Sequence, residues 1–328
     1  MKSSIAGLGI DTSCYTTSVA LAAGGCPVYD GRAPLEVSLG EAGLRQSDAV
    51  YQHVRALPGL IEQAFARARD LGLTVITVAA SAWPRRVEGS YMPVFNVSLG
   101  AGRAVAASLG AGLVEVSHQE GHVAAASYDL AADLPSEHLA LHISGGTTEL
   151  LLVRGAYDIE AIGGTNDLNA GQFIDRVGVA LGTGFPAGPD LERLAGSGEK
   201  GAVNLPAVGR DMWVSFSGPA SAALRAVQAG ASGPDVALAV FSCVGRAVGR
   251  LAARGMAYTG IHELVVAGGV ASNAIVRSVM EREISKAVVG ARVHFARADY
   301  ARDNAVGCAL LAYQEACRAC EATGGDCR

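Results

Sequence analysis

The feature that most constrains the fold is a strand, polar turn and second strand that occurs once in each half of the chain. In the first half, residues 8–13 form a strand that ends in a polar turn, and residues 17–21 form the returning strand. In the second half, residues 139–143 lead through the glycine turn at 144–148 into a strand at 149–153. Apolar runs bounded by turn residues are typical of hairpins. Two similar hairpins in one chain indicate an internal duplication, so we expect two related lobes.

Strands and helices alternate along the rest of the chain. Apolar residues at helical spacing predict helices at 47–70, 100–109, 170–181, 220–227, 236–254 and 304–320. Short apolar runs predict buried strands at 75–80, 113–116 and 264–267. This alternation predicts an α/β fold with largely parallel sheets. The segment 129–137, which contains Pro135, is the predicted linker, so we expect lobes at 1–135 and 136–328, with the last helix able to pack back on the first lobe.

The composition limits the class of protein. Half of the 328 residues are apolar and 17% are charged, which allows a large core. No uninterrupted apolar run approaches the roughly 18 residues that span a bilayer, and the first residues lack an apolar signal core, so we expect a cytoplasmic protein without a membrane partner. The net charge of −5 argues against a nucleic-acid binder with a broad basic face, although a local arginine patch or a partner subunit could still present RNA.

Seven cysteines are scattered along the chain, and reduced thiols are the expected state. The Cys317-x-x-Cys320 pair, with Cys327 nearby, could bind metal or cycle between redox states, but no second pair accompanies it. The alternative is a C-terminal helix followed by a tail.

His118 and His122 form a candidate metal site. Ser117 and Glu120 match a capping box, which predicts that a helix starts at His118 and places both imidazoles on one face. Glu120 then points away from them, so the base of a zinc protease is misplaced. Asp303 precedes the last predicted helix, where it could cap that helix or supply a third ligand. Two histidines and one aspartate suit Zn²⁺ or Fe²⁺, and the alternative is a pair of surface or cleft histidines.

Three glycine turns could hold a nucleotide. The turn at 144–148 exposes backbone N–H groups that can bind phosphate oxygens, and Asp11 occupies the matching place in the first hairpin. A buried strand opens through Gly268-Gly269 into a helix that begins near Asn273, a geometry suited to a purine or ribose. Asp175 could accept ribose hydroxyls, and Gly188 lies in a further glycine loop. An ordinary hairpin, strand-to-helix packing and a solvated helix charge are the alternatives.

Taken together, these residues resemble the transferase family that makes threonylcarbamoyladenosine in tRNA, formerly described as a sialoglycoprotein endopeptidase family. The resemblance covers essentially the whole chain. It implies the actin/Hsp70/sugar-kinase-like (ASKHA) fold, with two duplicated α/β lobes and a nucleotide cleft between them. The family's metal ligands correspond to His118, His122 and Asp303. Its substrate-binding positions correspond to His142, Ile143, Ser144, Gly145, Gly146, Asp175, Gly188 and Asn273.

The resemblance also implies a reaction and partners. The threonylcarbamoyl group would pass from its adenylate to N6 of adenosine 37, in tRNAs that read codons beginning with A. One divalent metal would assist, and a related non-catalytic subunit and an ATPase subunit would be partners.

This chain departs from the family pattern at three loops. Tyr15 and Thr16 replace two acidic residues, Thr147 replaces a histidine, and residues 83–93 replace a glycine-rich Gly-Pro-Gly loop. In that last loop Trp83, Arg85 and Arg86 could bind phosphate, stack on a base or lie in solvent. The departures leave two further hypotheses open: a carbamoyl or acyl transferase acting on a small metabolite, and a non-catalytic nucleotide-binding scaffold of the same fold.

Overall fold

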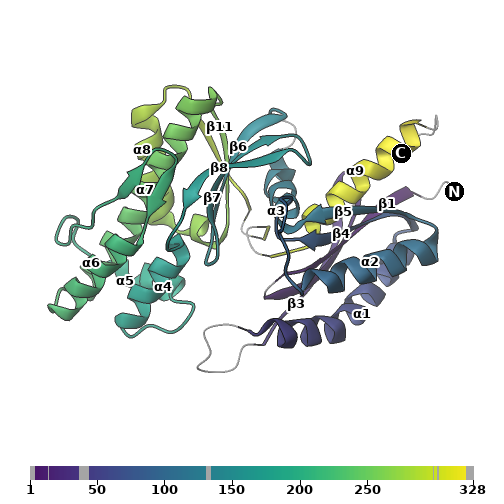
Figure 1. The fold of residues 1–328 in the computed structure, drawn as a ribbon, viewed down its shortest axis with the longest axis horizontal. Coiled ribbons are helices and arrows are strands. Elements are labelled where there is room, and N and C mark those ends of the chain that lie inside the picture. The colour runs from purple at the N-terminus through teal and green to yellow at the C-terminus, as the bar shows by residue number, and fades with distance from the viewer. Residues whose placement is uncertain are drawn as a thin grey trace. The chain divides into compact units, whose positions relative to one another are not determined.

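The computed structural model describes residues 4–13, 15–36, 44–130, 134–297, 299–300 and 303–322, and the chain divides into two compact units (Figure 1). Unit 1 comprises Met1–Tyr128 and Arg302–Arg328, and unit 2 comprises Asp129–Ala301. The change of unit between residues 128 and 129 lies at the start of the predicted linker, of which residues 131–133 lie outside the described residues. The C-terminal segment belongs to unit 1 rather than to a second lobe at 136–328.

Each unit is built on one mixed sheet. The sheet of unit 1 has the order β3 (Cys26–Pro34), β2 (Thr16–Ala23), β1 (Ser4–Thr12), β4 (Leu73–Trp83), β5 (Gly112–Ser117). The sheet of unit 2 has the order β12 (Arg292–Phe295), β11 (Glu263–Ala267), β6 (Glu137–Ile143), β7 (Thr148–Arg154), β8 (Ile159–Thr165), β10 (Trp213–Ser215), β9 (Val208–Arg210).

The two sheets repeat one topology. In unit 1, β1, β2 and β3 are antiparallel neighbours, and β4 pairs with β1 in parallel before β5 extends the sheet. In unit 2, β6, β7 and β8 take the antiparallel places, and β11 and β12 take the parallel ones. Both predicted hairpins are therefore confirmed. The expectation of largely parallel sheets is wrong, because strands joined by short turns must run antiparallel, and only strands reached through a helix run parallel.

Alternate residues of β1 face different helices. Leu8 and Ile10 are fully buried in the core that helices α1 (Gln46–Asp70) and α2 (Phe95–Leu109) cover on one side. Helix α9 (Val306–Ala322) packs on the opposite face of the sheet (Figure 1). There, a Cβ on Gly7 would lie 2.3 Å from the Tyr313 backbone nitrogen, and one on Gly9 would lie 2.3 Å from that of Ala309. Glycine at these two positions lets α9 pack directly on the strand.

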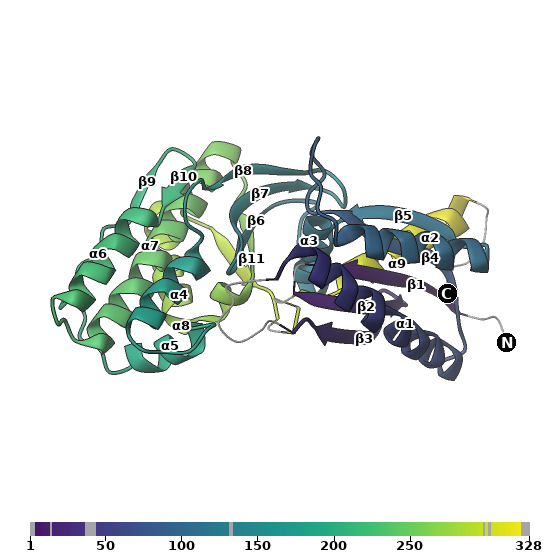
Figure 2. The ribbon, with the colours of Figure 1, turned by 60° about the horizontal axis from the view of Figure 1, so that its bottom comes forward.

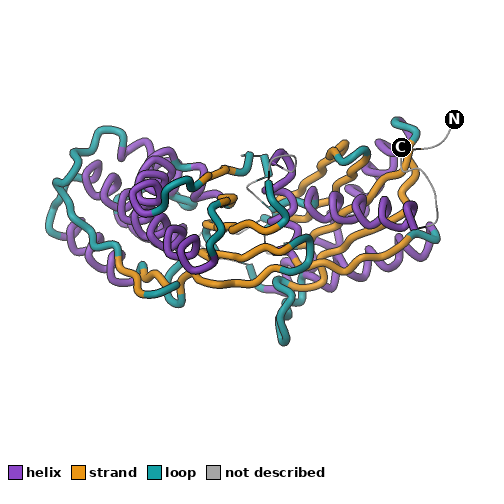
Figure 3. The backbone as a smooth tube through the Cα atoms, turned by 90° about the horizontal axis from the view of Figure 1, so that it is seen from above, coloured by secondary structure: helices purple, strands orange, loops and turns teal. Residues whose placement is uncertain are grey.

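The helices of unit 2 pack beside its sheet, and Figure 3 shows strands and helices side by side within each unit. They are α4 (Ala170–Ala180), α5 (Gly188–Ala195), α6 (Ser217–Gln228), α7 (Gly233–Thr259) and α8 (Ala274–Ala287), with the short helix η2 (Gly269–Ser272) before α8. Helix α7 is long and apolar enough to span a membrane by length and composition, but 78% of its apolar window is buried inside the protein. It contacts α4, α5, α6 and α8 and forms the centre of the unit 2 core.

Candidate functional site

Helix α3 (His118–Ser127) begins where the capping box predicted. The Ser117 hydroxyl accepts a hydrogen bond from the Glu120 backbone N–H at 3.1 Å, and the Glu120 carboxylate accepts one from the Ser117 N–H at 2.6 Å. These bonds satisfy two N–H groups that a helix N-terminus otherwise leaves without partners. The cap fixes the first turn of α3, and with it the position of His118. The prediction that Glu120 serves as a cap rather than as a protease base is confirmed.

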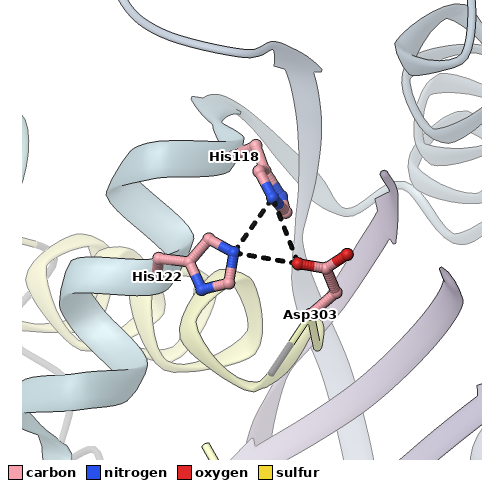
Figure 4. Close-up of side chains that lie close together, drawn as sticks. All are labelled: His118, His122 and Asp303. Carbon is pink, nitrogen blue, oxygen red and sulfur yellow. Dashed lines mark hydrogen bonds and ion pairs between the residues drawn. The ribbon is translucent and has the colours of Figure 1, made fainter. Parts of the chain in front are cut away.

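Three side chains of unit 1 converge beside this helix (Figure 4). The Nε2 atoms of His118 and His122 lie 2.9 Å apart. Asp303 Oδ1 lies 3.2 Å from Nε2 of His122 and 3.6 Å from Nε2 of His118. The three ligand atoms lie within 4.8 Å of one another. Two imidazoles and a carboxylate at this separation can bind one metal ion and leave coordination positions open.

Asp303 reaches the histidines because the chain returns to unit 1 at α9. The side chain of the next residue, Asn304, accepts a hydrogen bond from the Val306 N–H at 2.9 Å and so caps this helix. The Asp303 carboxylate is therefore available to the histidines. Its Oδ2 accepts a hydrogen bond from the Ser13 hydroxyl at 2.8 Å.

Asp11 lies behind His118. Its Oδ1 is 2.9 Å from the Nδ1 atom of His118, and its side chain is 1% exposed. An acceptor at Nδ1 keeps the proton on that nitrogen and leaves the Nε2 lone pair for a metal. The sequence grouped Asp11 with the nucleotide-binding residues, but in the structure its carboxylate contacts a candidate metal ligand. The place of Asp11 in the first hairpin could not predict this contact, because it depends on how α3 packs beside β1.

His53 supports the turn between β1 and β2, and the sequence did not indicate this role. It is fully buried on α1, where its Nε2 donates to the Ser13 carbonyl at 2.8 Å and its Nδ1 accepts from the Thr17 hydroxyl at 2.8 Å. Burial lowers the pKa of His53, so the neutral form with this donor and acceptor pattern is favoured. The available signal was the position of His53 between Ala49 and Leu57, at the helical spacing of the buried face of α1.

In the absence of metal, the carboxylates around His118 favour its protonated form. Burial alone would lower the pKa of His118, but the carboxylates of Asp11 and Asp303 outweigh it and raise the pKa well above 6.5. Burial likewise opposes ionisation of Asp303, yet hydrogen bonds from His118 and His122 hold its pKa well below the ordinary value. The metal-free site therefore favours a positively charged His118 between the carboxylates of Asp11 and Asp303.

The glycine turn of unit 2 presents backbone rather than side chains. Gly145 and Gly146 are exposed, and a Cβ on either would meet nothing within 4 Å. The Ser144 N–H donates to the Thr147 carbonyl at 2.8 Å, and the Asn169 side chain donates to the Gly146 carbonyl at 3.0 Å. The N-terminus of α4 thus packs against the turn. Backbone N–H groups of a glycine turn beside a helix N-terminus favour anions.

The other predicted nucleotide-binding residues of unit 2 occupy the neighbouring elements. Ile143 is fully buried at the end of β6, and His142 beside it is half-buried. Helix η2, which precedes Asn273, contacts both β6 and α4. Asn273 caps α8, since its Oδ1 accepts from the Val276 N–H at 2.9 Å, and its buried Nδ2 has no hydrogen-bond partner among the described residues.

Asp175 lies half-buried on α4. Its Oδ1 accepts a hydrogen bond from the Ala187 N–H at 2.8 Å, directly before Gly188 begins α5. Burial raises the pKa of Asp175 despite that bond. The carboxylate therefore holds the end of the loop that leads into Gly188.

Comparison with known proteins decides the family. The sequence profile described as tRNA N6-adenosine threonylcarbamoyltransferase matches residues 41–310. The chain belongs to this family. A relative of that name from Parasynechococcus marenigrum is 34% identical, with 97% of this chain and 93% of the relative covered. Another from Thermus thermophilus is 35% identical, with 94% and 92% covered.

Solved structures confirm the ASKHA fold of this family member. The structure of HypF from T. kodakarensis matches with a TM-score of 0.65 at 15% identity, over 95% of this chain and 48% of that one. A ROK family glucokinase from Streptomyces griseus matches with a TM-score of 0.55 at 13% identity, over 94% and 99%. At these identities the likeness shows the fold alone, and the predicted position of a nucleotide between the lobes stays a prediction.

Proposed function

We propose that this chain is a tRNA N6-adenosine threonylcarbamoyltransferase that takes the threonylcarbamoyl group from its adenylate and attaches it to adenosine 37. Family membership supports the reaction class. The observation that carries the proposal for this chain is the convergence of His118, His122 and Asp303, with Asp11 orienting the first imidazole. A scaffold that needed no metal would have no use for this arrangement.

The residues present fit one divalent metal. His118, His122 and Asp303 would hold it, and the carboxylates of Asp303 and Asp11 would balance its two positive charges. The set of two nitrogen ligands and one oxygen ligand suits Fe²⁺ or Zn²⁺. When bound, the metal would supply a Lewis acid for oxygens of the mixed anhydride.

The backbone of unit 2 would hold the adenylate. The N–H groups of the turn at Gly145 and Gly146, with the N-terminus of α4, would bind the phosphate. Asp175 would accept the ribose hydroxyls, and the Nδ2 of Asn273, which has no partner among the described residues, offers a donor. The adenine amine of the acceptor is a poor nucleophile, so holding both substrates in a reactive orientation would supply much of the rate acceleration.

Partner subunits would complete the RNA-binding surface. A net charge of −5 provides little general attraction for RNA, which favours recruitment through a local arginine patch or another chain. A related non-catalytic subunit and an ATPase subunit are the proposed partners, and the cytoplasm is the proposed location.

The test is a reconstituted reaction. The purified chain is mixed with threonylcarbamoyl adenylate, unmodified tRNA that reads codons beginning with A, and the two partner subunits, and the nucleosides are analysed by mass spectrometry. We expect threonylcarbamoyladenosine at position 37, and its loss when the metal is chelated. Failure to form it with every partner present would defeat the proposal.

The changed loops favour one second candidate, a carbamoyl or acyl transferase that acts on a small metabolite. Tyr15, which stands where the family usually has an acidic residue, is 52% exposed on unit 1. This candidate predicts that the chain binds the acyl adenylate but does not retain tRNA in a pull-down with the partner subunits.

A further inference from the structure

The loop that joins β4 to α2 is anchored to the helix that carries the two histidines. The loop projects from unit 1 (Figure 2). Its first residues leave the sheet beside α3, since Trp83 at the end of β4 pairs with Ser117 at the end of β5. The Gln119 N–H then donates to the Pro84 carbonyl at 3.1 Å. The loop therefore contacts the first turn of α3 through its backbone.

Arg86 adds a side-chain anchor at the same place. Its Nε donates to Glu120 Oε1 at 2.5 Å, and its Nη2 donates to Glu120 Oε2 at 3.0 Å and to the Glu115 carbonyl at 2.9 Å. The guanidinium also lies over the Trp83 ring, 5.3 Å from the ring centroid. A two-pronged contact with a carboxylate fixes geometry as well as charge. These bonds commit Arg86 to the protein and leave it poorly placed to bind a substrate phosphate.

Glu120 needs this partner because it is buried. Its side chain is 1% exposed, whereas that of Arg86 is 43% exposed. A buried carboxylate without a counter-charge is strongly unfavourable, so loss of the Arg86 side chain would drive the Glu120 carboxylate out of its buried position. That movement would break the capping box with Ser117, which sets the start of α3 immediately before His118.

We propose that Arg86 is a positioning residue of the metal centre. It acts through Glu120 and the cap to hold His118 and His122 in the geometry that binds the ion. This role rests on the proposed metal site. It assigns a function to the loop in which the chain departs from the Gly-Pro-Gly pattern.

Cobalt binding tests the role without an activity assay. The metal-free full chain is titrated with Co²⁺ against a chromophoric chelator, and the visible spectrum of the bound ion reports its ligand geometry. We expect Arg86→Ala to weaken Co²⁺ binding ~10–100-fold and to alter the spectrum, which is the usual effect of removing a residue that supports a metal ligand. Arg86→Lys should fall between, because lysine keeps the charge but not the two-pronged contact.

A double variant separates positioning from general stability. Glutamine can also occupy the last position of a capping box, so Glu120→Gln removes the buried charge while the cap remains. Adding Glu120→Gln to Arg86→Ala should therefore recover most of the Co²⁺ affinity. If Arg86→Ala does not fold, Arg86→Lys and the double variant carry the same comparison.

Arg103→Ala is the matched control. Arg103 pairs with Glu115 at 2.6 Å in the same unit, with side chains 61% and 32% exposed, and it lies on α2 rather than beside the capping box. Its loss should change the Co²⁺ dissociation constant by less than about twofold. An Arg86→Ala protein that melts at a lower temperature yet binds Co²⁺ like wild type would overturn the role of Arg86 alone. Wild-type protein that binds no Co²⁺ would overturn the metal site and this role with it.

Discussion

The β1–β2 hairpin of unit 1 and the β6–β7 hairpin of unit 2 are equivalent in topology, but they present opposite kinds of groups at the strand end. In unit 1 the residues that end β1 and enter the turn are buried, and their side chains are committed: Asp11 to His118, Thr12 to Ser98 on α2, and Ser13 to Asp303. In unit 2 the turn after β6 exposes Gly145 and Gly146, and its contacts are made by backbone. One turn orients candidate metal ligands with carboxylate and hydroxyl groups, and the other offers N–H groups to an anion. Duplicated strands thus provide two equivalent positions, and side-chain size decides which groups each position presents.

Removing a metal ligand should have the largest effect. A metal ion can supply several kcal/mol of transition-state stabilisation, and each 1.4 kcal/mol or so changes a rate tenfold. We expect His118→Ala to lose stoichiometric metal and to lower the transfer rate by ~10³-fold or more, as measured by metal analysis and product formation. Full activity in a metal-free His118→Ala protein would show that the candidate metal site has no catalytic role.

A side chain on the unit 2 turn should weaken nucleotide binding without harming the fold. Gly145 has open space around it, so Gly145→Val should fold normally, but the new side chain would block the N–H groups. Losing one or two charge-assisted hydrogen bonds predicts a roughly 10–100-fold weaker affinity for an adenylate, measured by calorimetry. Gly171→Ala is the contrasting variant, because its Cβ would lie 2.6 Å from the Gly145 Cα and should destabilise unit 2 itself. Unchanged adenylate affinity in Gly145→Val would contradict an anion role for the turn.

Asp11→Asn should weaken metal binding but leave nucleotide binding unchanged. The amide can still meet His118 Nδ1, but it lacks the negative charge that supports the imidazole. We expect a ~10–100-fold loss of metal affinity, measured by chelator competition. If the variant instead lost adenylate affinity and kept its metal, the original grouping of Asp11 with the nucleotide-binding residues would be correct.

Metal affinity should depend on pH in a way that Asp11 controls. A proton and a metal compete for Nε2 of His118, and the pKa of this histidine in the metal-free protein is raised well above 6.5. Affinity should therefore rise about tenfold per pH unit up to that raised pKa and then level off. The metal-free protein should instead lose stability as pH rises through the same pKa, because the charged pairs of His118 with Asp11 and Asp303 are then lost. In Asp11→Asn the affinity should level off at lower pH, and an unshifted profile would remove Asp11 as the cause.

The strongest local signals in the sequence predicted structure well. Ser117 and Glu120 placed the start of α3 at its first residue, because both ends of a capping box lie within one helical turn. The hairpins of β1–β2 and β6–β7 were predicted from apolar runs on both sides of a polar turn. The edge strands β3, β9 and β12 were missed, although the edge strand β5 was predicted. Strand β3 contains two prolines and a glycine and is exposed or half-buried throughout, so it lacks the apolar run that marks a central strand.

By itself, the sequence determined the local geometry of this protein: which residues cap a helix, which imidazoles share a face, and which turns lack side chains. Only the tertiary structure decided the contacts between distant segments. Asp303 meets His122 because α9 returns to the glycine face of β1, Ser13 meets Asp303 across 290 positions, and Arg86 reaches Glu120 across 34. Such pairings depend on the packing of whole elements and not on spacing along the chain. A periodicity that repeats every two or 3.6 residues therefore cannot encode them.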